Sequence, residues 1–240
     1  MSRLANIIIS DNIVRLGIDK IKSLDYAPPH SYDGLSIKNT INILEKFCYK
    51  IKLISFYDFN AGNFSDDEIF IVSQYILNRF NEEGDILNEI KSKVNKLINS
   101  GNHFILVHHF WPYYIFSDVL DIEYYKNGNK YWFQNKFDLK IIKPHQTLIN
   151  IDTFLQYNSD SLKSDEFTFL FKEKSKFTTL IQKIPKTKNP KNFISYGYQK
   201  NNKSYIFLID VHNIGEEETH SFYFDMLLNN TLNFIGSLIT

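Results

Sequence analysis

The chain has 240 residues, of which 43% are hydrophobic and 22% are charged, a composition typical of a folded protein with a substantial core. Lysine plus arginine and aspartate plus glutamate each number 27, and this zero net charge argues against a general surface for nucleic acid or anionic membranes. A single cysteine excludes an internal disulfide framework, and neither a signal peptide nor a membrane-spanning run is recognisable. These features predict a cytoplasmic protein.

The first half of the chain alternates short apolar runs with amphipathic segments. Strands are predicted at 5–10, 51–56 and 68–72, and a helix is predicted from Ser36 to about Tyr49. Cys48 falls on the apolar stripe of this helix, which predicts a core position rather than a reactive thiol. The polar stretch 58–67, which contains Gly62, is predicted to be a loop.

A helix followed by a strand forms the centre of the predicted fold. Apolar residues recur at helical spacing over 86–98, and Gly101 can take the left-handed conformation that ends a helix. Residues 104–107 are apolar without alternation, which is typical of a central parallel strand that is buried on both faces. The chain then changes to His108, His109, Phe110 and Trp111. Because ligands bind outside the carboxyl ends of strands in open α/β sheets, a binding site is predicted here.

The second half is richer in β-structure. Alternation over 130–142 predicts an edge or antiparallel strand that pairs around the Asn-Gly-Asn turn at 127–129. Further elements are predicted at 113–120 (a short helix), 167–171 and 177–184 (strands), 193–198 with 204–209 (a hairpin turning at Asn201-Asn202) and 222–235 (a closing helix). Without an internal repeat or a long linker, the chain is predicted to be a single α/β domain over 1–240, with a mainly parallel sheet.

Histidines gather at the ends of predicted elements. Five of the seven lie at predicted loop or strand ends: His108, His109, His145, His212 and His220. If the strands before His108 and His212 are neighbours in one parallel sheet, these histidines share its carboxyl edge with Asp11 and Asp58. Such a cluster can move a proton or bind a divalent metal. The alternative is that these are the polar residues in which strands usually end.

Several familiar catalytic patterns are absent from the sequence. The sequence contains no Gly-x-Ser-x-Gly turn and no glycine-rich phosphate loop. It also lacks the HExxH and CxxC spacings of metal ligands. A divalent metal cofactor remains an alternative, although the sequence contains no recognisable set of metal ligands. Trp111 can stack on a sugar or a base, or simply pack. The lysines of 183–191 are predicted to lie on a solvated loop.

Short motifs follow one another in the order known from one protein family. The segment KLINSGNHFILVHHF (96–110) is similar to that family's helix, glycine, apolar strand and histidine, and PHQT (144–147) is similar to its His-Pro-Ile-Thr stretch. SDEF (164–167) is similar to its Asp-Glu-Leu-Tyr, and 195–213 with 224–236 are similar to its last strand and closing helix. The chain thereby resembles the ThuA-like (trehalose-utilisation) family of the class I glutamine amidotransferase-like fold.

This resemblance implies a flavodoxin-like, three-layer α/β/α sandwich that binds or transforms a sugar-like small metabolite. True glutamine amidotransferases carry a cysteine after the strand that matches 104–107, where this chain has His108 and His109. Cys-dependent glutaminase activity is therefore not expected. The Asp-Glu motif contributes Glu166 as a candidate carboxylate.

The first hypothesis is a pocket at the carboxyl ends of the strands. His108 and His212 are the candidate catalytic residues, and the candidate binding residues are Asp11, His109, Trp111, His145, Glu166 and His220. One alternative is a non-catalytic module for binding or homo-oligomer assembly, which the missing nucleophile favours. Another is a nucleotide-derivative sensor or nucleosidase that uses the same crevice.

Overall fold

The computed structural model describes residues 3–9, 11–24, 37–72, 84–107, 116, 119–125, 137–157, 170–185, 193–210 and 217–238. Strands in this part of the chain form one sheet of eight strands and one of two. The larger sheet contains β1 (Leu4–Ile8), β2 (Lys50–Ile54), β3 (Ile69–Val72), β4 (His103–Val107), β6 (Phe137–Ile141), β8 (Thr178–Pro185), β9 (Phe193–Asn201) and β10 (Ser204–Ile209). The smaller sheet pairs β5 (Ile122–Tyr125) with β7 (Leu170–Glu173).

The larger sheet has a parallel half and an antiparallel half. Its strand order is β2-β1-β3-β4-β10-β9-β8-β6. Strands β2, β1, β3, β4 and β10 are parallel to one another, whereas β9, β8 and β6 each run antiparallel to the preceding neighbour. Numbered along the chain, the parallel strands lie in the order 2-1-3-4-5, which is the flavodoxin-like order. The predicted α/β architecture, mainly parallel with β-rich additions in the second half, is confirmed.

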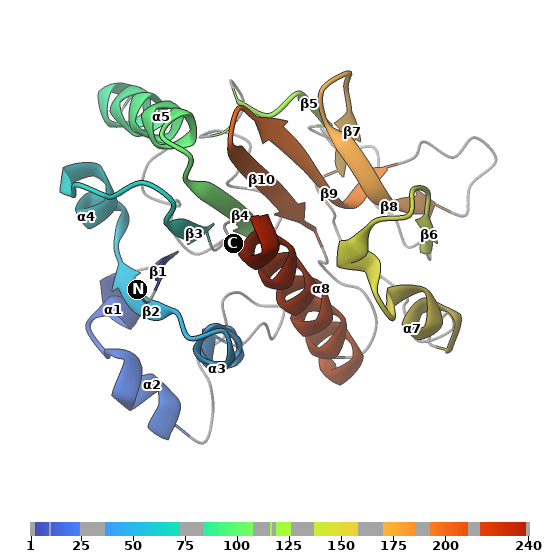
Figure 1. The fold of residues 1–240 in the computed structure, drawn as a ribbon, viewed down its shortest axis with the longest axis horizontal. Coiled ribbons are helices and arrows are strands. Elements are labelled where there is room, and N and C mark those ends of the chain that lie inside the picture. The colour runs from blue at the N-terminus through green and yellow to red at the C-terminus, as the bar shows by residue number, and fades with distance from the viewer. Residues whose placement is uncertain are drawn as a thin grey trace.

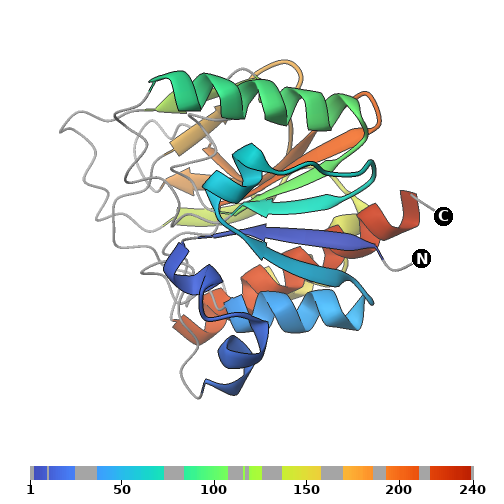
Figure 2. The same ribbon diagram turned by 90° about the vertical axis from the view of Figure 1, so that its left-hand side faces the viewer.

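Helices cover both faces of this sheet (Figures 1 and 2). One face carries α3 (Ile37–Lys46) and the long α8 (Glu217–Leu238), and the short helices α1 (Asp11–Val14), α2 (Ile18–Ser23) and α7 (Ile151–Tyr157) complete it. The other face carries α4 (Phe56–Ala61) and α5 (Gly84–Asn99), whose apolar side chains form a second core with the sheet. The molecule is thus a three-layer sandwich.

The predicted centre of the fold is confirmed. All five residues of β4 are buried, and β4 lies between two parallel neighbours, as its unbroken apolar run predicts. Helix α5 leads into it through Gly101, whose φ of 99° is the left-handed conformation that glycine adopts without strain. The hairpin of β9 and β10 is also confirmed, since Asn201 pairs with Ser204 across the turn.

Two predictions in the first half are wrong. The stretch 58–67 is not wholly a loop, because α4 begins after Ser55. The Ser55 hydroxyl accepts a hydrogen bond from the Asp58 N–H at 3.1 Å, and the Asp58 carboxylate accepts one from the Ser55 N–H, which together form a capping box. Cys48 is not a core residue. It is exposed in the turn after α3, with a left-handed φ of 59°.

The strand predicted within 130–142 is confirmed as an antiparallel strand at the edge of the larger sheet, β6, whereas the turn at 127–129 lies outside the described residues. The strand before it, β5, pairs with β7 in the smaller sheet, whereas the strand after it, β6, pairs with β8 at the edge of the larger sheet. Alternating residues show that a strand has two different faces, but they do not identify its neighbour.

Candidate functional site

The carboxyl ends of β4 and β10 lie side by side. These strands are parallel neighbours, and their last residues, Val107 and Ile209, are partners in the ladder. Strand β1 belongs to the same parallel array and ends at Ile8. The condition set by the sequence is therefore met, because the chain leaves β1, β4 and β10 at one edge of the sheet. We call it the carboxyl edge.

Most of the predicted site residues lie outside the described residues. These are His108, His109, Trp111, Glu166 and His212. His108 follows Val107 directly in the sequence, and His212 comes three residues after Ile209. His220 belongs to α8, but its side chain is outside the described part of the chain. The roles of these residues stay predictions.

The two aspartates expected at this edge differ in their surroundings. Asp11 is exposed and is the first residue of α1, close to the end of β1 in the sequence. Asp58 follows β2, but its carboxylate is engaged in the cap of α4, where it also accepts a hydrogen bond from the Ser55 hydroxyl at 2.8 Å. Asp11 therefore stays a candidate for ligand binding, whereas Asp58 has a structural role.

A buried ion pair at the carboxyl edge was missed by the sequence reasoning. The ammonium nitrogen of Lys183 in β8 lies 3.1 Å from a carboxylate oxygen of Asp210, which directly follows β10. Their side chains are only 1% and 0% exposed. The prediction that Lys183 lies on a solvated loop is wrong. Its side chain has to be desolvated, and the opposite charge of Asp210 offsets that cost.

Backbone contacts fix this pair to the ends of three strands. The Asp210 N–H donates to the Ser195 carbonyl at 2.7 Å, and the Ser195 hydroxyl donates to the Asp210 carbonyl at 3.2 Å. Lys183 is the partner of Phe193, the first residue of β9. The ion pair therefore connects the ends of β8, β9 and β10. His212 follows Asp210 by two residues in the sequence. The signal available in the sequence was that Lys183 falls inside the strand predicted at 177–184.

The structure places His145 away from the carboxyl edge. It precedes the short 3-10 helix η3 (Gln146–Leu148), and its Nδ1 accepts a hydrogen bond from the Thr147 N–H at 3.3 Å. Its ring lies 5.1 Å from that of Tyr198 and 5.0 Å from that of Phe234, near the end of α8. Burial lowers the pKa of His145. These contacts make it a packed capping residue.

A second polar cluster lies at the amino ends of the parallel strands, which we call the amino edge. Glu68 accepts hydrogen bonds from the Asn6 side-chain amide at 2.6 Å and from the Ser65 N–H at 2.8 Å. The Glu68 N–H donates to the Asn102 side-chain carbonyl at 2.9 Å. These bonds connect β1, β3 and the turn before β4.

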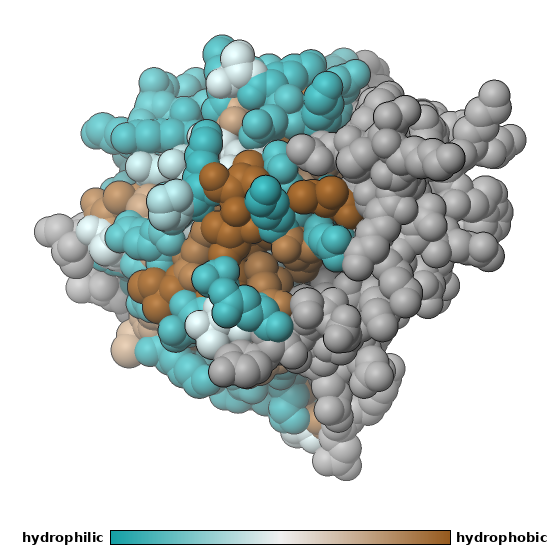
Figure 3. Space-filling view, turned by 90° about the vertical axis from the view of Figure 1, so that its right-hand side faces the viewer, coloured by the Kyte–Doolittle hydropathy of each residue, from teal (hydrophilic) through white to brown (hydrophobic). Residues whose placement is uncertain are grey.

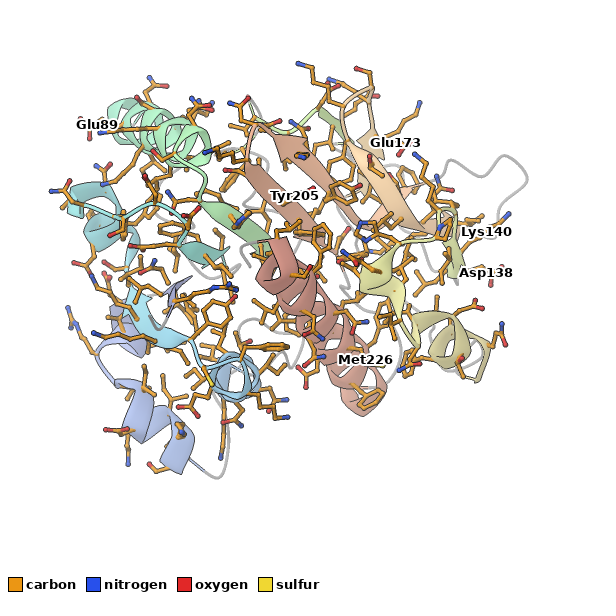
Figure 4. All side chains as sticks on the ribbon, in the orientation of Figure 1. Glu89, Asp138, Lys140, Glu173, Tyr205 and Met226 are labelled. Atoms are coloured by element: carbon orange, nitrogen blue, oxygen red, sulfur yellow. The ribbon has the colours of Figure 1, made fainter. Side chains whose placement is uncertain are left out.

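His103 belongs to the same edge. Its Nδ1 accepts a hydrogen bond from the N–H of Tyr205 at 3.1 Å, and Tyr205 lies on β10 near the end of α8 (Figure 4). Burial is the main cause that lowers the pKa of His103 to about 4, so that the ring is neutral near pH 7. The sequence analysis gave this histidine no role, and its contacts assign it a structural one.

The thiol of the chain can be placed relative to the carboxyl edge. Cys48, the only cysteine of the chain, stands just before β2 and hence at the amino edge. No thiol of this chain therefore follows β4 or β10.

Among the described residues there is no group of three or more His, Cys, Asp or Glu side chains that can hold a metal ion. Within the same residues, no helix is long and apolar enough to cross a membrane.

Comparison with known proteins gives only distant similarities. No family model and no curated protein matches the chain. Among solved structures, a cold-adapted β-galactosidase from Rahnella sp. R3 matches with a TM-score of 0.46 and 11% identity, covering 96% of this chain and 31% of that one. A GMP synthase subunit from Thermoplasma acidophilum matches with a TM-score of 0.45 and 8% identity, covering 99% of both chains. The chain thus spans about a third of the β-galactosidase, and similarities this low carry no argument about function.

Proposed function

We propose that this chain binds a sugar-like small molecule at the carboxyl edge of its parallel sheet. The adjacency of β4 and β10 carries the proposal, because the segments that begin with His108 and contain His212 start from neighbouring strand ends. The flavodoxin-like strand order supports it, since ligands of such folds bind outside the carboxyl ends of the strands. The sequence resemblance to ThuA-like proteins supports a sugar-like ligand and a role in carbohydrate metabolism in the cytoplasm.

In this proposal, His108 acts as a general acid or base, and His212, His109 and Asp11 contact the ligand. A neutral histidine suits proton transfer next to a carbonyl group, because its ordinary pKa lies close to neutral pH. The Lys183–Asp210 ion pair connects the carboxyl ends of β8 and β10, and β10 is the strand that precedes His212. It is a positioning device, since both side chains are buried.

A second candidate is a non-catalytic binding module. The position of Cys48 at the opposite edge favours it, because the nucleophile of a glutamine amidotransferase has no counterpart after β4. Both candidates use the same edge, and they differ in whether the bound ligand reacts.

A thermal-shift panel of sugars, keto-sugars, nucleotides and divalent metals tests the proposal. A ligand at 100 times its dissociation constant stabilises by about 2.7 kcal/mol, or roughly 5–10 °C for a chain of this size. We expect a sugar-like compound to give this shift, and His108→Ala to abolish it without lowering the melting temperature of the free protein. His145→Ala is the matched control, and it should keep the shift.

The other outcomes separate the alternatives. A shift by nucleotides alone would replace the proposal with a nucleotide-binding function. A sugar-induced shift that survives His108→Ala would move the site away from the carboxyl edge. Product analysis of the shifted complex distinguishes an enzyme from a binding module, because only an enzyme converts the compound.

A further inference from the structure

Helix α8 is held by different chemistry in its two halves. In the second half, the hydroxyls of Tyr196 in β9 and Thr231 share a hydrogen bond of 2.6 Å. In the first half, the side-chain amide of Asn39 in α3 donates to a carboxylate oxygen of Asp225 at 3.1 Å. The contact between α3 and the first half of α8 therefore includes a titratable group.

The flank of α8 that faces α7 is held by aromatic rings. The rings of Phe154 in α7 and Tyr223 in α8 stack 5.6 Å apart, and the ring of Phe222 lies 5.5 Å from that of Phe154. The side of the molecule that carries β6 and α7 shows hydrophobic residues gathered in the middle of its face, with polar residues around them (Figure 3). Burial raises the pKa of Tyr223, so its hydroxyl stays neutral. These ring contacts do not change charge near neutral pH.

Asp225 is partly buried where the two helices pack together. Its Oδ1 atom is buried and has no hydrogen-bond partner among the described residues. Burial raises the pKa of Asp225 from 3.8 to about 6, and the Asn39 amide and the charge of Lys46, both from α3, offset part of this rise. Within the described part of the chain, η3, α7 and β10, which also pack against α8, contribute no charged group that alters this pKa.

We propose that the contact between α3 and α8 is a pH-sensitive switch, closed while Asp225 carries a proton and loosened when its carboxyl ionises. A neutral carboxyl stays between the helices at little cost, whereas an ionised one gains hydration when it reaches water. The segment that contains His212 leads directly into the first half of α8, so the switch acts next to the carboxyl edge. It operates in the free protein and does not depend on the proposed function.

The two pKa values set the size of the effect. In the open form, Asp225 is hydrated and has its ordinary pKa of 3.8, whereas in the closed form its pKa is about 6. The closed form therefore binds the proton more readily, and its advantage is lost as the pH rises through 6. With these values, the equilibrium between open and closed forms shifts about tenfold towards the open form from pH 5 to pH 8.

Amide hydrogen exchange at pH 5 and pH 8, corrected for the intrinsic pH dependence of exchange, tests the proposal. We expect the protection of residues 222–228 to fall about tenfold in the parent chain, while that of β4 falls much less. Asp225→Asn keeps an acceptor for the Asn39 amide but cannot ionise, so its protection should not respond to pH. Asp152→Asn, which removes an exposed carboxylate of α7, is the matched control and should respond like the parent chain.

Three outcomes would overturn the switch. They are unchanged protection of 222–228 in the parent chain, the same pH response in Asp225→Asn, and an equal loss of protection in β4, which would mean that the whole fold loosens. Carboxyl-carbon NMR on the unaltered chain provides a second measurement that needs no variant. It should show Asp225 titrating with a midpoint near 6, and a midpoint near 3.8 would contradict a carboxyl that is buried between the helices.

Discussion

The two ends of the parallel sheet both bury polar groups, but they use different chemistry. At the amino edge, Glu68 is held by a side-chain amide and a backbone N–H, and Asn102 holds the Glu68 N–H in turn. At the carboxyl edge, Lys183 and Asp210 bring two opposite charges together, with their side chains 1% and 0% exposed. The cluster around Glu68 connects β1 and β3 with the turn before β4. The Lys183–Asp210 pair connects strand ends next to the predicted site.

This difference bears on the proposed function, because the two clusters need different explanations. A carboxylate that accepts bonds from amide and backbone donors satisfies groups that would otherwise be buried without partners. A desolvated ion pair often stabilises no more than a well-packed apolar pair in the same space. Stability alone therefore accounts for the amino edge, whereas for the ion pair we propose a positioning role at the strand ends before His212.

Breaking the ion pair on one side should have the largest effect on stability. Asp210→Ala leaves the Lys183 ammonium buried without its counter-charge, so we expect a loss of about 3–5 kcal/mol in the free energy of unfolding. Urea denaturation measures this loss. A loss below about 1 kcal/mol would mean that Lys183 reaches water in the folded chain.

The amino edge should respond less strongly. Glu68→Ala removes the acceptor of the Asn6 amide and of the Ser65 N–H. Leaving these two donors without their partner should lower the free energy of unfolding by roughly 2–3 kcal/mol. Ligand binding by the remaining folded protein should be unchanged, as measured by titration calorimetry at a temperature well below its melting point. A loss of binding there would contradict the assignment of the amino edge to structure alone.

The pH dependence of stability provides a directional test at the amino edge. The folded pKa of His103 is about 4 and the ordinary value is 6.5, so the unfolded chain takes up a proton first as the pH falls. The contribution of His103 is therefore present above pH 6.5 and is lost as the pH falls towards 4. Each unit of pH inside that window costs up to about 1.4 kcal/mol.

Asp225 acts in the opposite direction over much of the same range. Burial raises its pKa to about 6, so its folded form binds a proton more readily than the unfolded chain does. This contribution is present at low pH and is lost as the pH rises through 6. The test is therefore the difference between the parent chain and His103→Gln, which should shrink from pH 7 to pH 4.5. A constant difference would contradict a neutral, buried His103.

Replacing both members of the ion pair at once should have the smallest effect on stability. Lys183→Met combined with Asp210→Leu removes both charges together, so we expect the free energy of unfolding to stay within about 1 kcal/mol of that of the parent chain. Comparison with the two single variants in a double-mutant cycle measures the coupling. A double variant as unstable as Asp210→Ala would show that other contacts of Asp210 dominate.

The parts of the fold that local patterns determine were predictable from the sequence. The unbroken apolar run of β4 predicts burial on both faces, and Gly101 predicts the end of the preceding helix; both are confirmed. Helix α4 was missed because its capping residue Ser55 falls inside the predicted strand 51–56, and Asp58 falls inside the predicted loop 58–67. That cap is visible in the sequence and could have been used.

The missed features depend on contacts between distant residues. Lys183 is buried because Asp210, far along the chain, lies beside it, and the lysine-rich segment that follows Lys183 predicts the opposite. The separation of β5 and β6 into two sheets follows from their pairing with β7 and β8, which no local pattern contains. Of the candidate site, the shared edge was predicted conditionally, and the parallel pairing of β4 with β10 fulfils that condition.

The most direct test of the account compares ligand binding when each edge is altered separately. The thermal shift produced by the sugar-like ligand would be measured in the Lys183→Met/Asp210→Leu double variant and in Glu68→Gln, each relative to its own ligand-free melting temperature. We expect the shift to be lost or strongly reduced in the double variant and retained in Glu68→Gln. A shift retained by the double variant, or lost only in Glu68→Gln, would contradict the assignment of the carboxyl edge as the binding site.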